Sequence, residues 1–467
     1  MRVHGNLVSS SFVALALASG VQCLRKVIYF DQYHTATLPP RNVTSGITHV
    51  VMAFANSSLF IGDTAGPYTP FMNVSDVRNL FDQGTQIGIA LGGWADTAGF
   101  SAGSKDDASR KTYAQNVADM ADSHGFDFVD IDWEYPGGNG ADYKEVPNSE
   151  KVDEIPAYPK LLKEIKAAIS PKPLSIAVPG LPRDLLAYNE EQSPDIWAAV
   201  DFVNVMSYDF MNRRDNETKH HTDLRTSLEA VDAYLDLGLC PSKINLGFAF
   251  YAKYFQTEPG VDCSATPIGC PIVKAENDDG SDAGTSGSMT FETANVAPSV
   301  PGNLSTSTDG SCGTGTPFTC QGVADGQCCS QYGFCGSSAA HCGTGCQSDY
   351  GTCSGPAILD SFSKALKNGI TDDEAGGQWY WDADAELFWT YDTVALMQRK
   401  YTEIVKARGL GGVMAWSLGE DSYDWSHLLS LVHDTRGIRT ARRGPVKTSG
   451  FHQGRALPLG SHRSRHV

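Results

Sequence analysis

Short apolar runs alternate with amphipathic stretches along most of this chain. Eight runs of four to seven residues are rich in β-branched, aromatic and other apolar residues, which predicts β-strands. Between several of them, apolar residues recur at the spacing of a helical face, and glycines such as Gly125, Gly238 and Gly409 end the pattern. The predicted strands are residues 27–30, 49–54, 86–91, 126–131, 174–178, 202–206, 244–250 and 412–416.

Strands that alternate with helices in this way predict an α/β fold. Eight such repeats make a closed (β/α)8 barrel, the TIM barrel, whose active site lies at the carboxyl ends of the strands. An open doubly wound sheet is the alternative, but the Gly-rich phosphate turn of such a sheet is missing after the first predicted strand. We assign the barrel to residues 24–434.

A long insertion separates the seventh predicted strand from a helix near Val394. It opens with Cys263 and Cys270, and eight more cysteines follow within a short span. So short a segment cannot bury an adequate core, which predicts a small domain held together by disulfides. Zinc knuckles are the alternative, but the adjacent pair Cys328–Cys329 and a predicted export signal count against them. The eight are Cys312, Cys320, Cys328, Cys329, Cys335, Cys342, Cys346 and Cys353.

The two ends of the chain differ from the rest. Residues 1–23 combine Arg2, an apolar run and small residues, the layout of a secretory signal peptide. A buried N-terminal helix is the alternative, but the first predicted strand begins almost at once. Residues 435–467 are rich in Arg, Gly and Ser without hydrophobic periodicity, which predicts a basic disordered tail. We expect a secreted protein, extracellular or associated with a cell wall, without a membrane span.

Composition narrows the expected partners. The 467 residues are 41% hydrophobic, as in globular proteins, and carry a formal charge of −18 at pH 7. An acidic chain cannot neutralise phosphates, so we expect no nucleic-acid partner. We expect a monomer without cofactor or metal, since no His/Cys cluster has the spacing of a zinc site. Sequons that fit a glycoprotein stand at Asn42, Asn56, Asn73, Asn216 and Asn303.

One predicted strand carries acids among its apolar residues. The stretch 125–136 reads GFDFVDIDWEYP, and burying its carboxylates is costly unless they are paired or protonated. From Asp130 the acids recur at every second residue, so Asp130, Asp132 and Glu134 share one face. Neighbouring carboxylates raise one another's pKa, which keeps a carboxyl group protonated for acid catalysis. A solvated acidic strand end is the alternative.

The pattern D-x-x-D-x-D-x-E, from Asp127 to Glu134, resembles the signature of glycoside hydrolase family 18, the chitinases. The resemblance implies hydrolysis of chitin with retained configuration, assisted by the substrate's own N-acetyl group. It makes Glu134 the acid, Asp132 the group that orients the amide, and Asp130 the group that tunes Asp132. Asp127 joins the expected substrate-binding residues.

Other segments match this family. Residues 206–209, MSYD, are similar to its M-x-Y-D motif, so Tyr208 and Asp209 are expected to hold the acetamido group beside Met206. A purely structural Tyr–Asp hydrogen bond is the alternative. Trp416 matches the tryptophan that floors the sugar site, although core packing would also explain it. The family's S-x-G-G becomes ALGG at residues 90–93, which loses a hydroxyl near the acids. Tyr135 and Gly93 complete the expected substrate-binding set.

The run CCSQYGFCG at residues 328–336 resembles the hevein-like chitin-binding module, carbohydrate-binding module family 18. The resemblance places this module at residues 309–355, inserted in the barrel. It makes Ser330, Tyr332 and Phe334 the sugar contacts, with His341 in place of a third aromatic ring, so binding should be weaker and pH-sensitive. Loss of both rings should reduce binding to insoluble chitin and spare soluble oligomers. The implied disulfides are 312–329, 320–335, 328–342 and 346–353, and Cys263 is expected to pair with Cys270.

Some interpretations remain open at this point. The aromatic segment 376–392 is expected either to touch sugar through Trp381, Trp389 or Tyr391, or to pack a loop. Cys240 is expected to be a buried free thiol. The expected activity is that of an endo-acting chitinase. A chitin lectin with an inactive barrel, an endoglycosidase of N-linked glycans and a toxin-type subunit that uses chitin hydrolysis to enter cells are the alternatives.

Overall fold

The structure is a computed structural model that describes residues 24–291, 302–313, 315–355 and 358–433. All of these residues belong to one compact unit, Gln22–Thr440. The expected signal peptide and the expected basic tail lie outside the described residues.

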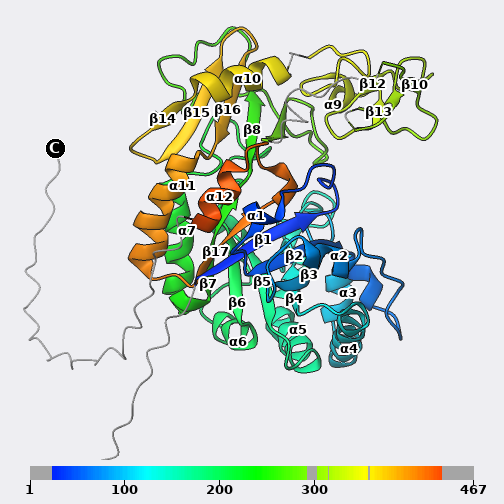
Figure 1. Cartoon of the computed structure of the whole chain (residues 1–467), viewed down its shortest axis with the longest axis vertical. Coiled ribbons are helices and arrows are strands. Elements are labelled where there is room, and N and C mark those ends of the chain that lie inside the picture. Colours follow the sequence, from blue (N-terminus) through cyan, green and yellow to red (C-terminus); the bar gives the residue numbers. More distant parts are fainter. Residues whose placement is uncertain (1–23, 292–301, 314, 356–357, 434–467) are drawn as a thin grey trace, which may run out of the picture. The chain divides into compact units, whose positions relative to one another are not determined.

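Eight parallel strands close a barrel in the order β1-β17-β7-β6-β5-β4-β3-β2, with helices around it (Figure 1). Every predicted barrel strand is present, and the (β/α)8 expectation is confirmed. The ends shift by one or two residues; β4, for example, begins at Phe128. The strands are β1 Arg25–Asp31, β2 His49–Ala55, β3 Gln86–Gly92, β4 Phe128–Asp132, β5 Leu174–Pro179, β6 Phe202–Met206, β7 Ile244–Ala249 and β17 Gly412–Trp416.

The helices follow the predicted amphipathic stretches. Helix α4, for example, ends where Gly125 takes φ 72° and its N–H bonds back to the carbonyls of Ala121 and Asp122. A left-handed residue at this position favours glycine, which is why the pattern stops there. The helices of the barrel are α1 Arg41–Thr44, α2 Val74–Asn79, α3 Ala98–Ser104, α4 Asp107–His124, α5 Glu154–Ala168, α6 Ser193–Ala199, α7 Leu224–Asp236, α11 Val394–Lys400 and α12 Ser426–His433.

Strand β4 shows how the barrel separates its two cores. Val129 and Ile131 belong to the main apolar cluster, which also contains apolar residues of the surrounding helices, whereas Phe128 belongs to the cluster inside the barrel. Asp130 points the same way as Phe128, because it bonds to the interior residue Tyr29. The alternation predicted from the sequence therefore directs the acids of β4 inward.

The insertion after β7 forms a five-stranded antiparallel sheet, in the order β14-β15-β16-β8-β9, packed against helix α10. The disulfide-rich module is inserted between β9 and α10 (Figure 1). The elements are β8 Tyr251–Gln256, β9 Ser286–Thr290, β14 Ile370–Asp372, β15 Gly377–Asp382, β16 Leu387–Tyr391 and α10 Ile358–Asn368.

The aromatic segment 376–392 builds this sheet. Trp389 is fully buried and donates from Nε1 to Ser361 Oγ at 2.9 Å, and Tyr391 donates to the carbonyl of Ala365 at 2.6 Å. Trp381 is partly buried and packs against a small apolar cluster that includes Phe255 of β8 and Phe388 of β16. None of the three lines the large cleft described below. The packing alternative therefore holds for the buried Trp389 and Tyr391, whereas contact between Trp381 and sugar stays a prediction.

The disulfide-rich module is small and irregular. Its elements are β10 Ser305–Thr306, β11 Phe318–Thr319, β12 Cys328–Cys329, β13 Cys335–Gly336 and α9 Ala339–Cys342. The disulfides join Cys312 to Cys329, Cys320 to Cys335, Cys328 to Cys342 and Cys346 to Cys353, the pairing that the hevein-like resemblance implies, and Cys263 joins Cys270 in the insertion.

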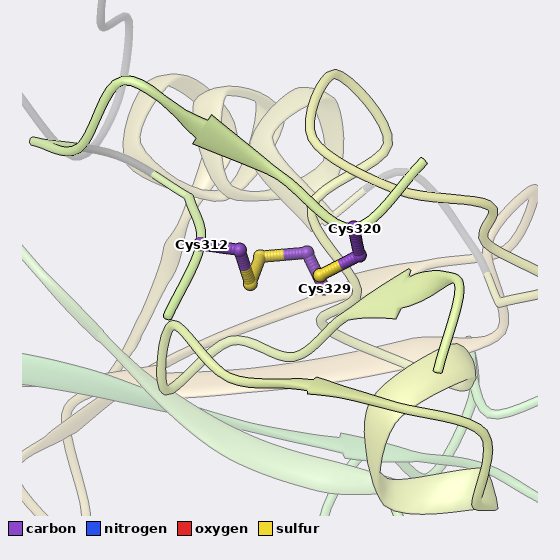
Figure 2. A group of neighbouring side chains, drawn as sticks. All are labelled: Cys312, Cys320 and Cys329. Atoms are coloured by element: carbon purple, nitrogen blue, oxygen red, sulfur yellow. A yellow bond between two sulfur atoms is a disulfide. The ribbon is translucent and has the colours of Figure 1, made fainter. Parts of the chain in front are cut away.

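Three cysteine sulfurs of the module, from Cys312, Cys320 and Cys329, lie within 4.8 Å of one another (Figure 2). Such a cluster resembles a metal site, but each sulfur is already bonded to another sulfur. A disulfide offers no thiolate, so these residues do not form a zinc knuckle. Cys240 is the free cysteine of the described residues, and it is exposed, not buried as expected. It lies at the turn before β7, where its sulfur is 3.1 Å from Ser242 Oγ.

Candidate active site

A cleft of about 730 Å³ opens at the carboxyl ends of the barrel strands. Its volume suits a small-molecule or oligomer site. Residues after β1, β3, β4, β5 and β6 line it, together with residues of β8 and β9 from the insertion sheet. This is the end at which barrels of this type hold their active sites. The expected site residues that line it are Gly93, Asp132, Glu134, Tyr135, Met206, Tyr208, Asp209, Trp416 and Tyr332.

Asp130 lies beneath the cleft, fully buried among hydrogen-bond donors. Tyr29 Oη donates to it at 2.8 Å, Ser175 Oγ at 2.5 Å and Asn204 Nδ2 at 3.3 Å. Burial raises the pKa of Asp130 to about 6, although these hydrogen bonds oppose the rise. Ala90 faces Asp130 across β3 and β4, so the hydroxyl lost there is supplied by Ser175 and Tyr29 instead.

Asp132 ends β4 and reaches the cleft. Its side chain is 3% exposed, and its Oδ1 has no hydrogen-bond partner within the described part of the chain. Burial raises its pKa well above the usual range, and the neighbouring carboxyl groups of Glu134 and Asp130 raise it further. A buried, unpartnered carboxyl oxygen facing a cleft is suited to accept a hydrogen bond from a ligand.

Glu134 follows two residues after β4 and is 9% exposed. Burial raises its pKa to about 8; the Tyr135 hydroxyl opposes the rise, while Asp209 and Asp184 add to it. At neutral pH the Glu134 carboxyl is therefore mostly protonated and holds a proton that it can donate. This is the protonation state required of a general acid.

Asp209 has the opposite protonation state. Its Oδ1 accepts from Tyr251 Oη at 2.8 Å and from Lys253 Nζ at 3.0 Å. Burial opposes ionisation, but Lys253 and His221 outweigh it and hold the pKa of Asp209 below its usual range. Asp209 also takes φ 57°, in the left-handed region that disfavours side chains. Two of its partners, Tyr251 and Lys253, belong to strand β8 of the insertion sheet, and the third, His221, lies in the loop between β6 and α7.

Tyr208 is buried beside this carboxylate and lines the cleft. Its hydroxyl lies 3.9 Å from Met414 Sδ, and its ring packs edge-on against Tyr251. The purely structural alternative was a hydrogen bond between Tyr208 and Asp209. The described residues do not form it. The Tyr208 hydroxyl is thus held without a strong polar partner.

The floor of the cleft is aromatic. Trp416 stacks on Phe54 at 5.5 Å between ring centroids and tilts against Tyr29 at 5.6 Å. Gly93 lies beside Phe54 with φ 95°, and a Cβ there would come within 2.9 Å of the Phe54 ring. The glycine therefore keeps this wall of the cleft open.

The Glycosyl hydrolases family 18 profile matches residues 25–421. The chain belongs to this family. Chitinase 1 of Aphanocladium album is 27% identical over 278 residues, a match that covers 52% of this chain and 62% of that protein. Endochitinase 1 of Metarhizium robertsii is 28% identical over 274 residues, with the same coverage. The chain thus spans less than two thirds of the length of these curated relatives.

Solved structures share the fold of this family 18 chain. A chitinase from Rhizomucor miehei superposes with a TM-score of 0.61 at 20% identity, covering 88% of this chain and 99% of that one. A family 18 chitinase from Cycas revoluta, solved as a mutant in complex with (GlcNAc)4, gives a TM-score of 0.58 at 20% identity, covering 89% of this chain and 100% of that one.

No helix of the described residues is long and apolar enough to cross a membrane.

One acid of the family signature lies elsewhere. Asp127 precedes β4, so it lies at the amino end of the strand, opposite the cleft. Its carboxylate accepts from Arg78 Nη1 at 2.7 Å and from the backbone N–H of Ile87 at 2.8 Å. The expectation that Asp127 binds substrate is therefore corrected: it joins β4 to β3 and α2 at the other end of the barrel.

Two expected contacts of the module form hydrogen bonds within the module, and one of them is buried. Ser330 is 3% exposed, and its Oγ accepts from the backbone N–H of Phe334 at 3.2 Å. His341 bonds through Nδ1 to Ser338 Oγ at 2.7 Å and packs over Gly336. Tyr332 and Phe334, by contrast, are each 60% exposed.

Sequence reasoning missed several residues of the cleft. Asp184 lies in the loop after β5, and burial raises its pKa; its Oδ1 lacks a partner among the described residues. The Arg214 guanidinium lies over the rings of Tyr143 and Trp94, at 3.8 and 5.6 Å from their centroids. These residues stand in loops without periodic patterns, so only the folded chain brings them together.

Proposed function

We propose that this chain is a chitinase that hydrolyses β-1,4-linked N-acetylglucosamine polymers with retained configuration. The observation that carries the proposal is the buried Glu134, whose pKa is raised to about 8, in electrostatic contact with Asp132 at the barrel cleft. The names of the fungal relatives and the oligosaccharide bound by the Cycas revoluta enzyme support this substrate.

In the proposed reaction, Glu134 donates its proton to the glycosidic oxygen as the bond to the anomeric carbon breaks. The carbonyl oxygen of the substrate's own N-acetyl group attacks that carbon, which gives an oxazolinium intermediate. Asp132 accepts the acetamido N–H through its unpartnered oxygen and so orients the amide for attack. Glu134, now a carboxylate, then removes a proton from the water that opens the intermediate.

The neighbouring residues position the sugar in this proposal. Trp416, supported by Phe54, offers a flat face for the pyranose ring. Tyr208 has a hydroxyl without a strong partner, which is available to the acetamido group. Asp209 remains ionised beside Lys253, so it serves as an acceptor and not as an acid. Met206, Tyr135 and Gly93 complete the wall.

We also propose that residues 309–355 form a hevein-like chitin-binding module. The disulfide pairing and the two exposed rings of Tyr332 and Phe334 support this assignment. Five disulfides in the described chain support an oxidising, extracellular location. Secretion through residues 1–23 and glycosylation of the sequons belong to the same proposal.

Two hexamers of equal length test this function. The chitin hexamer carries N-acetyl groups, whereas the glucosamine hexamer lacks them but keeps the same linkage and ring. Turnover of the first without the second is the expected result, because the proposed nucleophile belongs to the acetyl group. Equal turnover of both would contradict substrate assistance, and binding without any turnover would favour a lectin.

A further inference from the structure

The disulfide-rich module is docked on the edge of the insertion sheet. Gln331 accepts from Tyr254 Oη at 3.0 Å, and its Nε2 donates to the carbonyl of Ser286 at 3.3 Å. The backbone N–H of Thr344 donates to the carbonyl of Gly284 at 3.0 Å. The module is therefore held against β8 and β9 by its own side chains and backbone.

Glycines on both sides of this contact allow close approach. A Cβ at Gly287 of β9 would lie 2.2 Å from Gln331 Oε1, and a Cβ at Gly345 of the module would lie 2.3 Å from Tyr254 Oη. No side chain fits at either position without displacing the other surface. The two surfaces are thus complementary, and the contact fixes the position of the residue that follows Gln331.

That residue is Tyr332, which reaches the catalytic cleft. Its Oη lies 3.5 Å from Asp282 Oδ2, and Asp282 lies 3.6 Å from the Arg213 guanidinium. Tyr332, Asp282 and Arg213 line the same cleft as Glu134. The Tyr332 ring is 60% exposed, so it offers a free face. Phe334 is equally exposed, but it does not line the cleft.

We propose that Tyr332 forms an outer sugar subsite of the catalytic cleft, so that a chitin chain bound at Glu134 extends onto the module. This inference rests on the proposed function, since it requires a chitin chain in the cleft. A tyrosine ring combines an apolar face with a polar tip, which suits stacking on a pyranose at the edge of a wet cleft. Only chains long enough to span from Glu134 to the module use this subsite.

The two exposed rings of the module then have different roles. Tyr332 acts on the chain being hydrolysed, whereas Phe334 contacts chitin outside the cleft. The expectation that loss of both rings spares soluble oligomers is revised accordingly. It now applies to Phe334 alone.

Steady-state kinetics on soluble chitin oligomers, from trimer to hexamer, test the subsite. Tyr332→Ala is expected to lower kcat/KM for the hexamer by about 3- to 10-fold, mainly through KM, and to leave the trimer unchanged. Tyr332→Phe keeps the ring and should match the wild type. Tyr423→Ala is the control, because it removes an exposed aromatic ring that neither lines the cleft nor belongs to the module.

The possible outcomes separate this inference from the proposed function. A wild type that cleaves none of the oligomers would overturn the proposed function itself. An active wild type with Tyr332→Ala equal to it at every length would overturn the subsite alone. An equal loss on trimer and hexamer would also overturn it, because a general defect would then explain the result. Calorimetric affinity for the hexamer, measured in the inactive Glu134→Gln background, should fall by the same factor with Tyr332→Ala.

Discussion

The pH dependence of catalysis is set by the proton on Glu134. With its pKa at about 8, roughly nine tenths of the molecules carry this proton at pH 7 and about one tenth at pH 9. Activity is therefore present below pH 8 and falls about tenfold for each pH unit above it. The Tyr135 hydroxyl hydrogen-bonds this carboxyl and stabilises its charged form, which lowers the pKa.

The substitution Tyr135→Phe removes this hydroxyl and tests its effect on the pKa of Glu134. In Tyr135→Phe the charged carboxylate loses a hydrogen bond, so the pKa of Glu134 rises and the alkaline limb of the pH profile moves upward. A hydrogen bond to a charged group contributes about 1.5 kcal/mol, which corresponds to a shift of about one pH unit. The tyrosine ring remains, so the shape of the cleft is kept.

The assay is kcat/KM on a soluble chitin oligomer from about pH 5 to pH 10. Circular dichroism at each pH separates catalytic loss from unfolding. An alkaline limb that moves downward in Tyr135→Phe would refute the reasoning, because the sign of the hydrogen-bond effect would be wrong. Full activity of the wild type at pH 9 would refute the assignment of the proton donor.

Three further substitutions test other parts of the structure. Lys400→Met leaves the fully buried Asp392 without its ion pair at 2.7 Å and should lower the free energy of unfolding by about 3–5 kcal/mol in urea denaturation. Ser175→Ala removes a donor to Asp130, so the pKa of Asp130 rises above 6; kcat/KM should fall by about tenfold, and an unchanged pH profile would contradict this role. Asp127→Ala should cost about 1 kcal/mol of stability and leave kcat/KM unchanged, whereas a large loss of activity in the folded variant would return it to the site.

The sequence predicted the barrel because local regularities determine it. Each barrel strand is an apolar run between helices, so the same strand–helix unit recurs along the chain. The acids of β4 were equally accessible to sequence reasoning, because the alternation of a strand places Asp130 and Asp132 on the interior side whatever surrounds them. Because this alternation is a local property of a strand, it can be predicted from the sequence without knowing which distant segments surround the strand.

The errors lie where long-range packing decides. Asp127 belongs to the same acidic motif, but it precedes β4 and so lies at the opposite end of the barrel, paired with Arg78. Trp389 has the aromatic ring that is typical of a sugar contact, but it is buried within the insertion sheet. The position of Tyr332 depends on how the module docks through Gln331, which no local pattern encodes.

The most direct test of the account compares the wild type with Glu134→Gln on a soluble chitin hexamer, with anomer ratios recorded early in the reaction. The substitution keeps the size of the side chain and removes the proton donor. We predict β-anomer products from the wild type and a loss of turnover of about 10²–10⁴-fold or more in the variant. Early α-anomers, or a variant that keeps wild-type turnover, would contradict the assignment of Glu134 as the acid of a retaining chitinase.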